Sequence, residues 1–179
     1  MKQEKIIILG ASGSGKDYLL RKLAEKGLKT CLKWTTRPAR KFEQNGITYN
    51  FVEDNQFKDA INENKFLTYQ EFVVTPEDSK EVTWYYGITI EEFNEAQAFI
   101  MTPGELKDLN DEMRKKCFIV YLDIDRSVRE SRLFRRDDKN DSIKRRLDAD
   151  DNDFNIEIDY DLRVTDPEFG VDDIFNLMN

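Results

Sequence analysis

The 179-residue sequence predicts an α/β protein with a mostly parallel core sheet flanked by helices. Short apolar runs, often β-branched, alternate with segments whose apolar residues recur at helical spacing. The first run, 6–9, also leads straight into a glycine-rich stretch and then into a helical pattern with Leu19 and Leu23 on one face. A buried strand, a tight loop and a helix in that order are typical of a parallel sheet.

Side-chain composition excludes several kinds of chemistry. The chain contains no histidine, which rules out His-dependent triads, histidine general bases and His-ligated zinc. Its two cysteines, Cys31 and Cys117, stand in apolar runs. We expect them to be small buried residues rather than a disulfide or a metal pair.

Net charge and hydropathy indicate which kinds of binding partner are not expected, namely nucleic acid and membrane. The formal net charge of −8 predicts no extended nucleic-acid surface. No apolar stretch reaches membrane-spanning length and the N-terminus lacks a long apolar core, so we expect a cytoplasmic protein with no membrane partner. The sequence leaves both a monomer and a homodimer open.

The glycine-rich stretch predicts a phosphate-binding P-loop. It consists of Gly10, Ala11, Ser12, Gly13, Ser14, Gly15, Lys16 and Asp17. Its glycines allow the positive φ angles and close approach that point successive N–H groups at one anion. Lys16 adds a positive charge, and the helix that follows directs the positive end of its dipole at the phosphate. The alternative is a glycine-rich turn that binds no ligand.

One position departs from the P-loop pattern G-x-x-x-x-G-K-[ST]. Asp17 replaces the hydroxyl residue that usually holds Mg²⁺. A carboxylate can also hold this metal, directly or through water. We therefore predict that Asp17 is a metal ligand.

The chain between 34 and 89 reads as a small β-rich insertion. The first helix is expected to end at Gly27, which suits the left-handed residue after a helix. Strand-like runs then cover 32–36, 47–52, 66–74 and 82–88, with a short helix around 57–61. A polar, basic loop separates the first two of these runs and closes at the turn signal Asn45-Gly46.

After the insertion, apolar residues again recur at helical spacing, and three capping boxes mark where helices are expected to begin. These are Thr89 with Glu92, Thr102 with Glu105, and Ser127 with Glu130. We expect Leu106, Leu109 and Met113 to share the apolar face of one helix. Further strands are predicted at 98–101, 117–124 and 160–165, and a last helix at 171–178.

An arginine-rich helix follows the strand at 117–124. Arg129, Arg132 and Arg136 lie at i, i+3 and i+7, which puts three guanidinium groups on one helix face. A solvated helix face is the alternative, and for Arg129 it is the interpretation we adopt. Asp123 and Asp125, just before this helix, could be metal ligands, but we interpret them as helix-entry residues.

Several motifs in fixed order resemble those of guanylate kinases. They are Thr35-Thr36-Arg37-Pro38-Ala39-Arg40, then Glu43, Gly46, Tyr49 and Phe51-Val52, then Tyr85-Tyr86-Gly87. With the P-loop and the arginine helix, they cover nearly the whole chain. The resemblance implies a P-loop kinase core at 1–33 and 90–179, a monophosphate-binding domain at 34–89, and a helical lid at about 136–146.

The resemblance also implies roles for individual residues in an ATP- and Mg²⁺-dependent reaction. Arg37, Arg40, Tyr49 and Tyr86 would hold the acceptor phosphate, and Glu43 would orient the arginines. Lys16, Arg132, Arg136 and Arg146 would surround the transferred phosphoryl group. Such a transfer depends on positioning and charge neutralisation, so it needs no histidine.

The chain departs from the family pattern where guanine is recognised. The acidic residue that reads guanine falls on or near Thr68, and the hydroxyl residue after Tyr-Tyr-Gly becomes Ile88. Glu71 could restore one carboxylate if the register shifts. Loss of these polar groups argues for an acceptor other than, or broader than, GMP.

The P-loop ending Gly-Lys-Asp resembles that of some phage deoxynucleoside monophosphate kinases, which favours a deoxynucleotide or a modified pyrimidine. Two other functions stay open: a kinase that phosphorylates a hydroxyl on a modified nucleotide or DNA base, and an inactive guanylate-kinase-like binding scaffold. Lys16 and the arginines argue against the scaffold.

Overall fold

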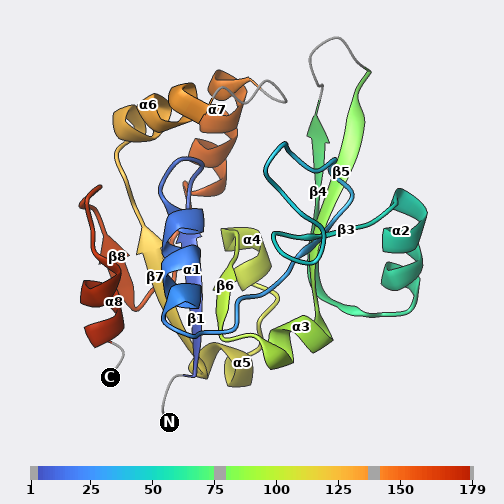
Figure 1. The fold of residues 1–179 in the computed structure, drawn as a ribbon, viewed down its shortest axis with the longest axis horizontal. Coiled ribbons are helices and arrows are strands. Elements are labelled where there is room, and N and C mark those ends of the chain that lie inside the picture. The colour runs from blue at the N-terminus through green and yellow to red at the C-terminus, as the bar shows by residue number, and fades with distance from the viewer. Residues whose placement is uncertain (1–3, 75–79, 137–141, 178–179) are drawn as a thin grey trace. The chain divides into compact units, whose positions relative to one another are not determined.

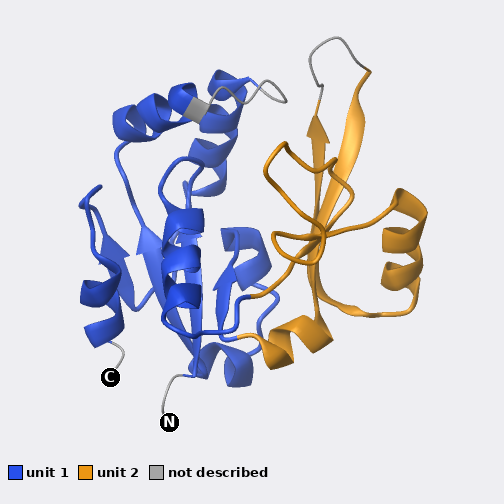
Figure 2. Cartoon of the chain, viewed as in Figure 1, with its two compact units in different colours: residues 1–30, 97–179 blue, residues 31–96 orange. Residues whose placement is uncertain are grey.

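The computed structural model of the chain describes residues 4–74, 80–136 and 142–177. The chain divides into two compact units, Met1–Thr30 with Gln97–Asn179 (unit 1) and Cys31–Ala96 (unit 2), as Figure 2 shows. Unit 2 is wider at both ends than the predicted insertion at 34–89. Helix α3 (Ile90–Glu95) belongs to it because that helix packs against β4 (Phe66–Val74) and β5 (Val82–Thr89).

Unit 1 contains a parallel sheet, which confirms the predicted fold class. Within the described residues the strand order is β6-β1-β7-β8, and each neighbouring pair is parallel (Figure 1). The strands are β1 (Lys5–Gly10), β6 (Ala98–Ile100), β7 (Cys117–Leu122) and β8 (Leu162–Val164). The helices are α1 (Lys16–Glu25), α4 (Pro103–Leu106), α5 (Asp111–Lys115), α6 (Arg126–Arg136), α7 (Ile143–Asp153) and α8 (Val171–Leu177).

The core of unit 1 forms where apolar strand residues meet the apolar face of α1. Ile6 and Ile8 of β1 pack in one cluster with Leu19 and Leu23, all four almost completely buried, and Ile174 of α8 joins them. Every residue of β1 is buried, as a central parallel strand requires. This packing fixes the position of the loop that joins β1 to α1.

Unit 2 is built on a four-stranded sheet of order β3-β2-β5-β4 within the described residues. It comprises β2 (Trp34–Thr35), β3 (Asn50–Phe51), α2 (Asp54–Asn62), β4 and β5. Phe57 of α2 stacks on Phe66, with ring centroids 4.4 Å apart. A Cβ on Gly87 would lie 2.6 Å from the Phe66 ring, so only glycine allows this close packing.

Some of the helix ends predicted from local sequence are confirmed by the structure, and others are wrong. Thr102 and Glu105 form the predicted capping box with Pro103 in the first turn, and Gly27 has a φ of 92° just after α1. The predicted capping box at Ser127 and Glu130 is wrong, because α6 already begins at Arg126 and Ser127 lies inside the helix. Asp125 Oδ1 accepts from the Ser127 N–H over 2.8 Å, and hydrogen bonding from Ser127 lowers the pKa of Asp125.

Other predicted elements are shorter in the structure. The single helix expected to carry Leu106, Leu109 and Met113 is two short helices, α4 and α5, because Asn110 caps a new helix by accepting from the Met113 N–H. Strand β8 covers Leu162–Val164 and β3 covers Asn50–Phe51, inside the longer runs predicted. In the described part of the chain, no helix is both long enough and apolar enough to span a membrane.

Candidate active site

The predicted P-loop joins β1 to the N-terminus of α1 and depends on glycine at two positions. Gly13 and Gly15 have φ angles of 79° and 107°, in the left-handed region that side chains rarely adopt. A Cβ on Gly13 would also lie 2.8 Å from the backbone carbonyl oxygen of Arg129. Helix α6 therefore packs directly on the loop.

Lys16 is the first residue of α1 and folds back over the loop. Its Nζ donates to the carbonyl oxygens of Gly10 and Ala11, over 2.6 and 2.9 Å. The Ser14 N–H also donates to the Ala11 carbonyl, over 3.2 Å. The loop is thus closed by its own lysine, with a positive charge at the start of a helix, where an anion binds well.

Asp17 is exposed in the first turn of α1, and its carboxylate is the kind of hard oxygen donor that Mg²⁺ binds. Its role as a metal ligand stays a prediction. Among the described residues, no group of three or more acidic, cysteine or histidine side chains could enclose a metal. A Mg²⁺ ion held here would share its coordination sphere with phosphate oxygens and water, as Mg²⁺ commonly does.

The side chain of Arg132, on α6, donates directly to the backbone of the loop. Its Nη1 donates to the carbonyl oxygens of Gly13 and Ser14 over 3.3 and 3.2 Å, and its Nη2 donates to Pro167 over 2.6 Å. Arg146 lies half-buried near the start of α7. Arg136 ends α6, its side chain is outside the described part, and so are residues 137–141 of the predicted lid.

Arg129 is buried, so its interpretation as part of a solvated face is wrong. It is only 6% exposed, and its Nε donates to the Ile124 carbonyl over 3.0 Å. Helix α7 packs against α6 and supplies carboxylates to it: Arg129 Nη2 donates to Asp151 over 3.2 Å, and Nη1 lies 3.8 Å from Asp150. The acidic run at 148–153 was the signal for this pairing.

Arg37 organises the predicted acceptor site in unit 2. It is 3% exposed, its Nε donates to Tyr86 Oη over 3.0 Å, and its Nη2 donates to both carboxylate oxygens of Glu43. Tyr49 places its ring 5.6 Å from the Arg37 guanidinium. Glu43 also accepts from the Arg40 N–H over 2.8 Å. The five residues predicted to hold or orient an acceptor phosphate therefore lie together.

Burial and the Arg37–Glu43 hydrogen bond shift the pKa values of these two residues in opposite directions. Burial by itself would lower the pKa of Arg37, but its hydrogen bond to Glu43 leaves the pKa raised. Burial would raise the pKa of Glu43, but the hydrogen bond from Arg37 leaves it lowered. Both groups stay ionised, and the arginine keeps its positive charge in a buried position.

The β4–β5 hairpin separates the predicted base-reading residues. Thr68 pairs with Ile88, and Gln70 pairs with Tyr86, so these four side chains share one face. Thr68 and Ile88 are buried there. Glu71 pairs with Tyr85 on the opposite face, which packs on α2. The structure thus sets Glu71 apart from Tyr86 and Arg37.

Gln70 is a residue that sequence reasoning missed. It lies two positions after Thr68 and directly across the hairpin from Tyr86. The sequence did contain a signal for it: Gln70 is two positions from Thr68 on the same predicted strand, and residues at this spacing lie on the same face. Its amide brings one donor and one acceptor group to the face that carries Tyr86.

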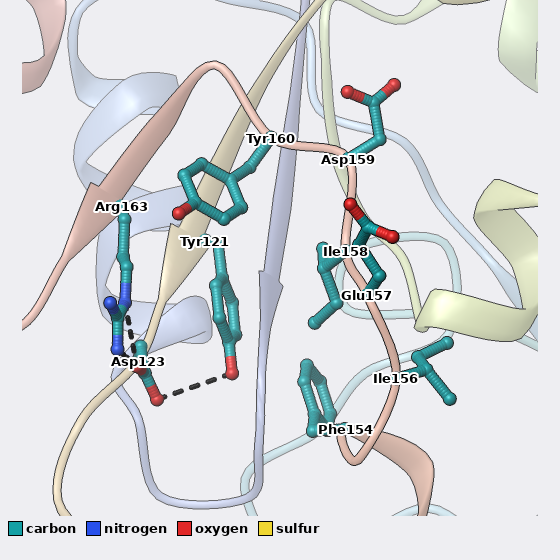
Figure 3. Close-up of a pocket in the computed structure, with 9 residues that line it drawn as sticks. All are labelled: Tyr121, Asp123, Phe154, Ile156, Glu157, Ile158, Asp159, Tyr160 and Arg163. Carbon is teal, nitrogen blue, oxygen red and sulfur yellow. Dashed lines mark hydrogen bonds and ion pairs between the residues drawn. The ribbon is translucent and has the colours of Figure 1, made fainter.

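A cavity of about 700 Å³ lies in unit 1 beside β8 (Figure 3). Tyr121 stacks on Phe154 there, with ring centroids 5.7 Å apart. The Tyr121 hydroxyl donates to Asp123, which also accepts from Arg163 Nε over 2.8 Å. Burial and the neighbouring Asp123 raise the pKa of Tyr121 to about 12. Asp123 therefore bonds to Tyr121 of β7 and Arg163 of β8 and is not a helix-entry residue, whereas Asp125 directly precedes α6 and accepts from the Ser127 N–H.

Comparisons with known proteins agree with this arrangement. The sequence model of the guanylate kinase family matches residues 2–176. The chain is 30% identical to the guanylate kinase of Prochlorococcus marinus (strain MIT 9312), over 81% of this chain and 79% of that protein. It is 26% identical to the guanylate kinase of Rickettsia typhi, over 92% of this chain and 84% of that protein.

A solved structure gives the same result for the fold. The guanylate kinase from Anaplasma phagocytophilum aligns with a TM-score of 0.66 and 18% identity, covering 99% of this chain and 86% of that one. The family match spans a P-loop, an arginine-rich helix and a buried Arg37–Tyr86–Glu43 cluster. The chain therefore belongs to the guanylate kinase family of nucleoside monophosphate kinases.

Proposed function

We propose that this kinase transfers the γ-phosphoryl group of ATP directly to the phosphate of a nucleoside monophosphate whose base is not strictly guanine. The observation that carries the proposal is the buried guanidinium of Arg37, held ionised by Glu43 and bonded to Tyr86. A buried arginine that keeps its positive charge beside tyrosine hydroxyls is suited to attract a phosphate group.

On the donor side, loop N–H groups, Lys16 and Arg132 would hold the ATP phosphates. Both side chains already contact the loop backbone, which supports this assignment. Asp17 would hold Mg²⁺, whose charge helps to neutralise the phosphates. Arg136 and Arg146 would spread charge over the phosphoryl group as the lid closes and excludes water.

On the acceptor side, Arg37 and Arg40 would bind the acceptor phosphate together with the hydroxyls of Tyr49 and Tyr86. Glu43 would orient both arginines, since its carboxylate bonds to the side chain of one and the backbone of the other. These groups hold the acceptor oxygen in place for in-line attack, which supplies much of the catalysis in phosphoryl transfer.

The hairpin face beside Tyr86 would contact the acceptor base. Guanine presents two neighbouring donors on its pairing edge, which a carboxylate satisfies. Thr68 offers one hydroxyl, Ile88 offers no polar group, and Gln70 offers an amide with one donor and one acceptor. This set suits a base with a donor beside an acceptor, such as a pyrimidine, and a deoxynucleotide or modified pyrimidine is our preferred acceptor.

A panel of acceptors tests the proposal. ADP production from ATP and Mg²⁺ is measured with each ribo- and deoxynucleoside monophosphate, and Lys16→Ala serves as the inactive control. We expect turnover with at least one acceptor and poor turnover with GMP. If no acceptor raises ADP production above background, the kinase proposal fails, and a strong preference for GMP refutes its base-specificity part alone.

A further inference from the structure

A carboxylate of the chain itself lies on the phosphate loop. The backbone N–H of Ser12 donates to Asp150 Oδ2 over 2.8 Å, although the two residues are 138 positions apart. Asp150 belongs to α7, and both residues are in unit 1. An N–H of a glycine-rich loop is the kind of donor that binds a phosphate oxygen, and a carboxylate oxygen is a similar anionic acceptor.

The peptide group between Ala11 and Ser12 is held from both ends. Its carbonyl oxygen accepts from Lys16 Nζ over 2.9 Å and from the Ser14 N–H over 3.2 Å, while its N–H donates to Asp150. Lys16 and the loop N–H groups are what an incoming phosphate would need. The contact with Asp150 therefore engages the same part of the loop.

The packing of α6 and α7 presents Asp150 to the loop. Arg129 Nη1 lies 3.8 Å from the same Asp150 oxygen, and its Nη2 bonds to the neighbouring Asp151. Arg129 is buried, and its backbone carbonyl lies against Gly13 of the loop. One buried arginine thus holds both the acidic helix and the loop.

We infer that Asp150 is an internal competitor for phosphate, occupying one donor of the loop until an ATP phosphate displaces it. The inference rests on the proposed phosphate-binding role of the loop. A carboxylate and a phosphate oxygen repel each other at one N–H, so binding of ATP requires the Asp150 contact to break. The apparent affinity for ATP is then reduced by the equilibrium constant for that opening.

Binding to the full chain without any acceptor tests this inference. Calorimetric titrations with ATP and with inorganic pyrophosphate compare the native protein with Asp150→Ala, Asp150→Asn and Asp148→Asn. The last variant is the matched control, because Asp148 lies on the same helix and pairs with Arg126 and Lys144. Pyrophosphate reports on the loop without a contribution from a base.

We expect Asp150→Ala to lower the Kd of both ligands about tenfold, the value of one charge-assisted hydrogen bond. Asp150→Asn should lower it less, because a neutral amide oxygen still accepts. Asp148→Asn should leave it within about twofold. Amide hydrogen exchange at Ser12 should become faster in nucleotide-free Asp150→Ala, which reports the lost contact in a folded protein.

Two results would overturn the inference. Equal or weaker binding by Asp150→Ala, with unchanged exchange at Ser12, removes Asp150 as a competitor and leaves the proposed kinase function intact. Failure of every variant to bind ATP or pyrophosphate refutes the phosphate-binding role of the loop and, with it, both proposals.

Discussion

Glu43 accepts hydrogen bonds from the same Nη2 atom of Arg37 with both of its carboxylate oxygens, over 2.8 and 2.9 Å. The carboxylate is 13% exposed and the guanidinium side chain 3% exposed, so water competes little for either group. The pair fixes the direction of the arginine without any ligand, and a preorganised charge of this kind is what the proposed phosphate site requires.

Glu43→Gln should therefore weaken acceptor binding. A glutamine has one acceptor oxygen and no charge, so Arg37 loses part of its orientation. We expect the KM for the acceptor to rise about tenfold while the Kd for ATP stays unchanged. Steady-state kinetics and ATP titration give the two values. Glu63→Gln, an exposed residue paired with Lys65, is the control, and an equal effect of both variants would contradict the role of Glu43.

The same pair predicts a pH dependence of stability. Hydrogen bonding from Arg37 lowers the pKa of Glu43 below its ordinary value of 4.5 despite burial. Ionised Glu43 therefore stabilises the folded state above that value, and this stabilisation is lost as the pH falls through the lowered pKa. The difference in Tm between the native protein and Glu43→Gln should shrink on acidification. A difference that grows at low pH would show that the sign is wrong.

Thr68→Glu should increase the use of GMP, because a carboxylate can accept from both donors on the pairing edge of guanine. Since Thr68 is buried, Gln70→Glu is a second variant on the same face. We expect kcat/KM for GMP, relative to the best native acceptor, to rise at least about tenfold in one of them. Thr83→Glu puts the same charge on the opposite face. An unchanged preference in both test variants would contradict our placement of the base.

Arg132→Ala should lower kcat about 100-fold, by removal of one charged donor from the phosphoryl group. Arg126→Ala is the matched control on the same helix, because Arg126 is exposed and pairs with Asp148 and Asp151. Rapid-quench measurement of the chemical step separates this loss from slow product release. Comparable losses in the two variants would mean that Arg132 acts through the stability of α6.

Asp17→Ala should weaken the binding of Mg²⁺·ATP more than the binding of metal-free ATP. The reason is that the carboxylate would contact the metal and not the nucleotide. Titrations with ATP in the presence of Mg²⁺ and in the presence of a chelator give the two affinities. Equal losses under both conditions would remove Asp17 as a metal ligand.

Local sequence patterns were sufficient for several elements of the fold. The runs predicted at 66–74 and 82–88 became β4 and β5, and the strand, loop and helix at the N-terminus are β1, the P-loop and α1. Their signals depend on residues a few positions apart: β-branched alternation, glycine spacing and capping residues. The ordered motifs around Arg37, Tyr49 and Tyr86 were sufficient for the family.

Tertiary structure decided which charged and polar groups meet. Arg129 pairs with carboxylates of α7 because that helix packs on α6, Gln70 faces Tyr86 because of the hairpin register, and Asp150 reaches Ser12 across 138 positions. A helical pattern states which face is polar, but it does not state which distant group covers that face. By itself the sequence determined the P-loop, the parallel sheet and the family, whereas burial of charge was decided by packing between segments far apart in the chain.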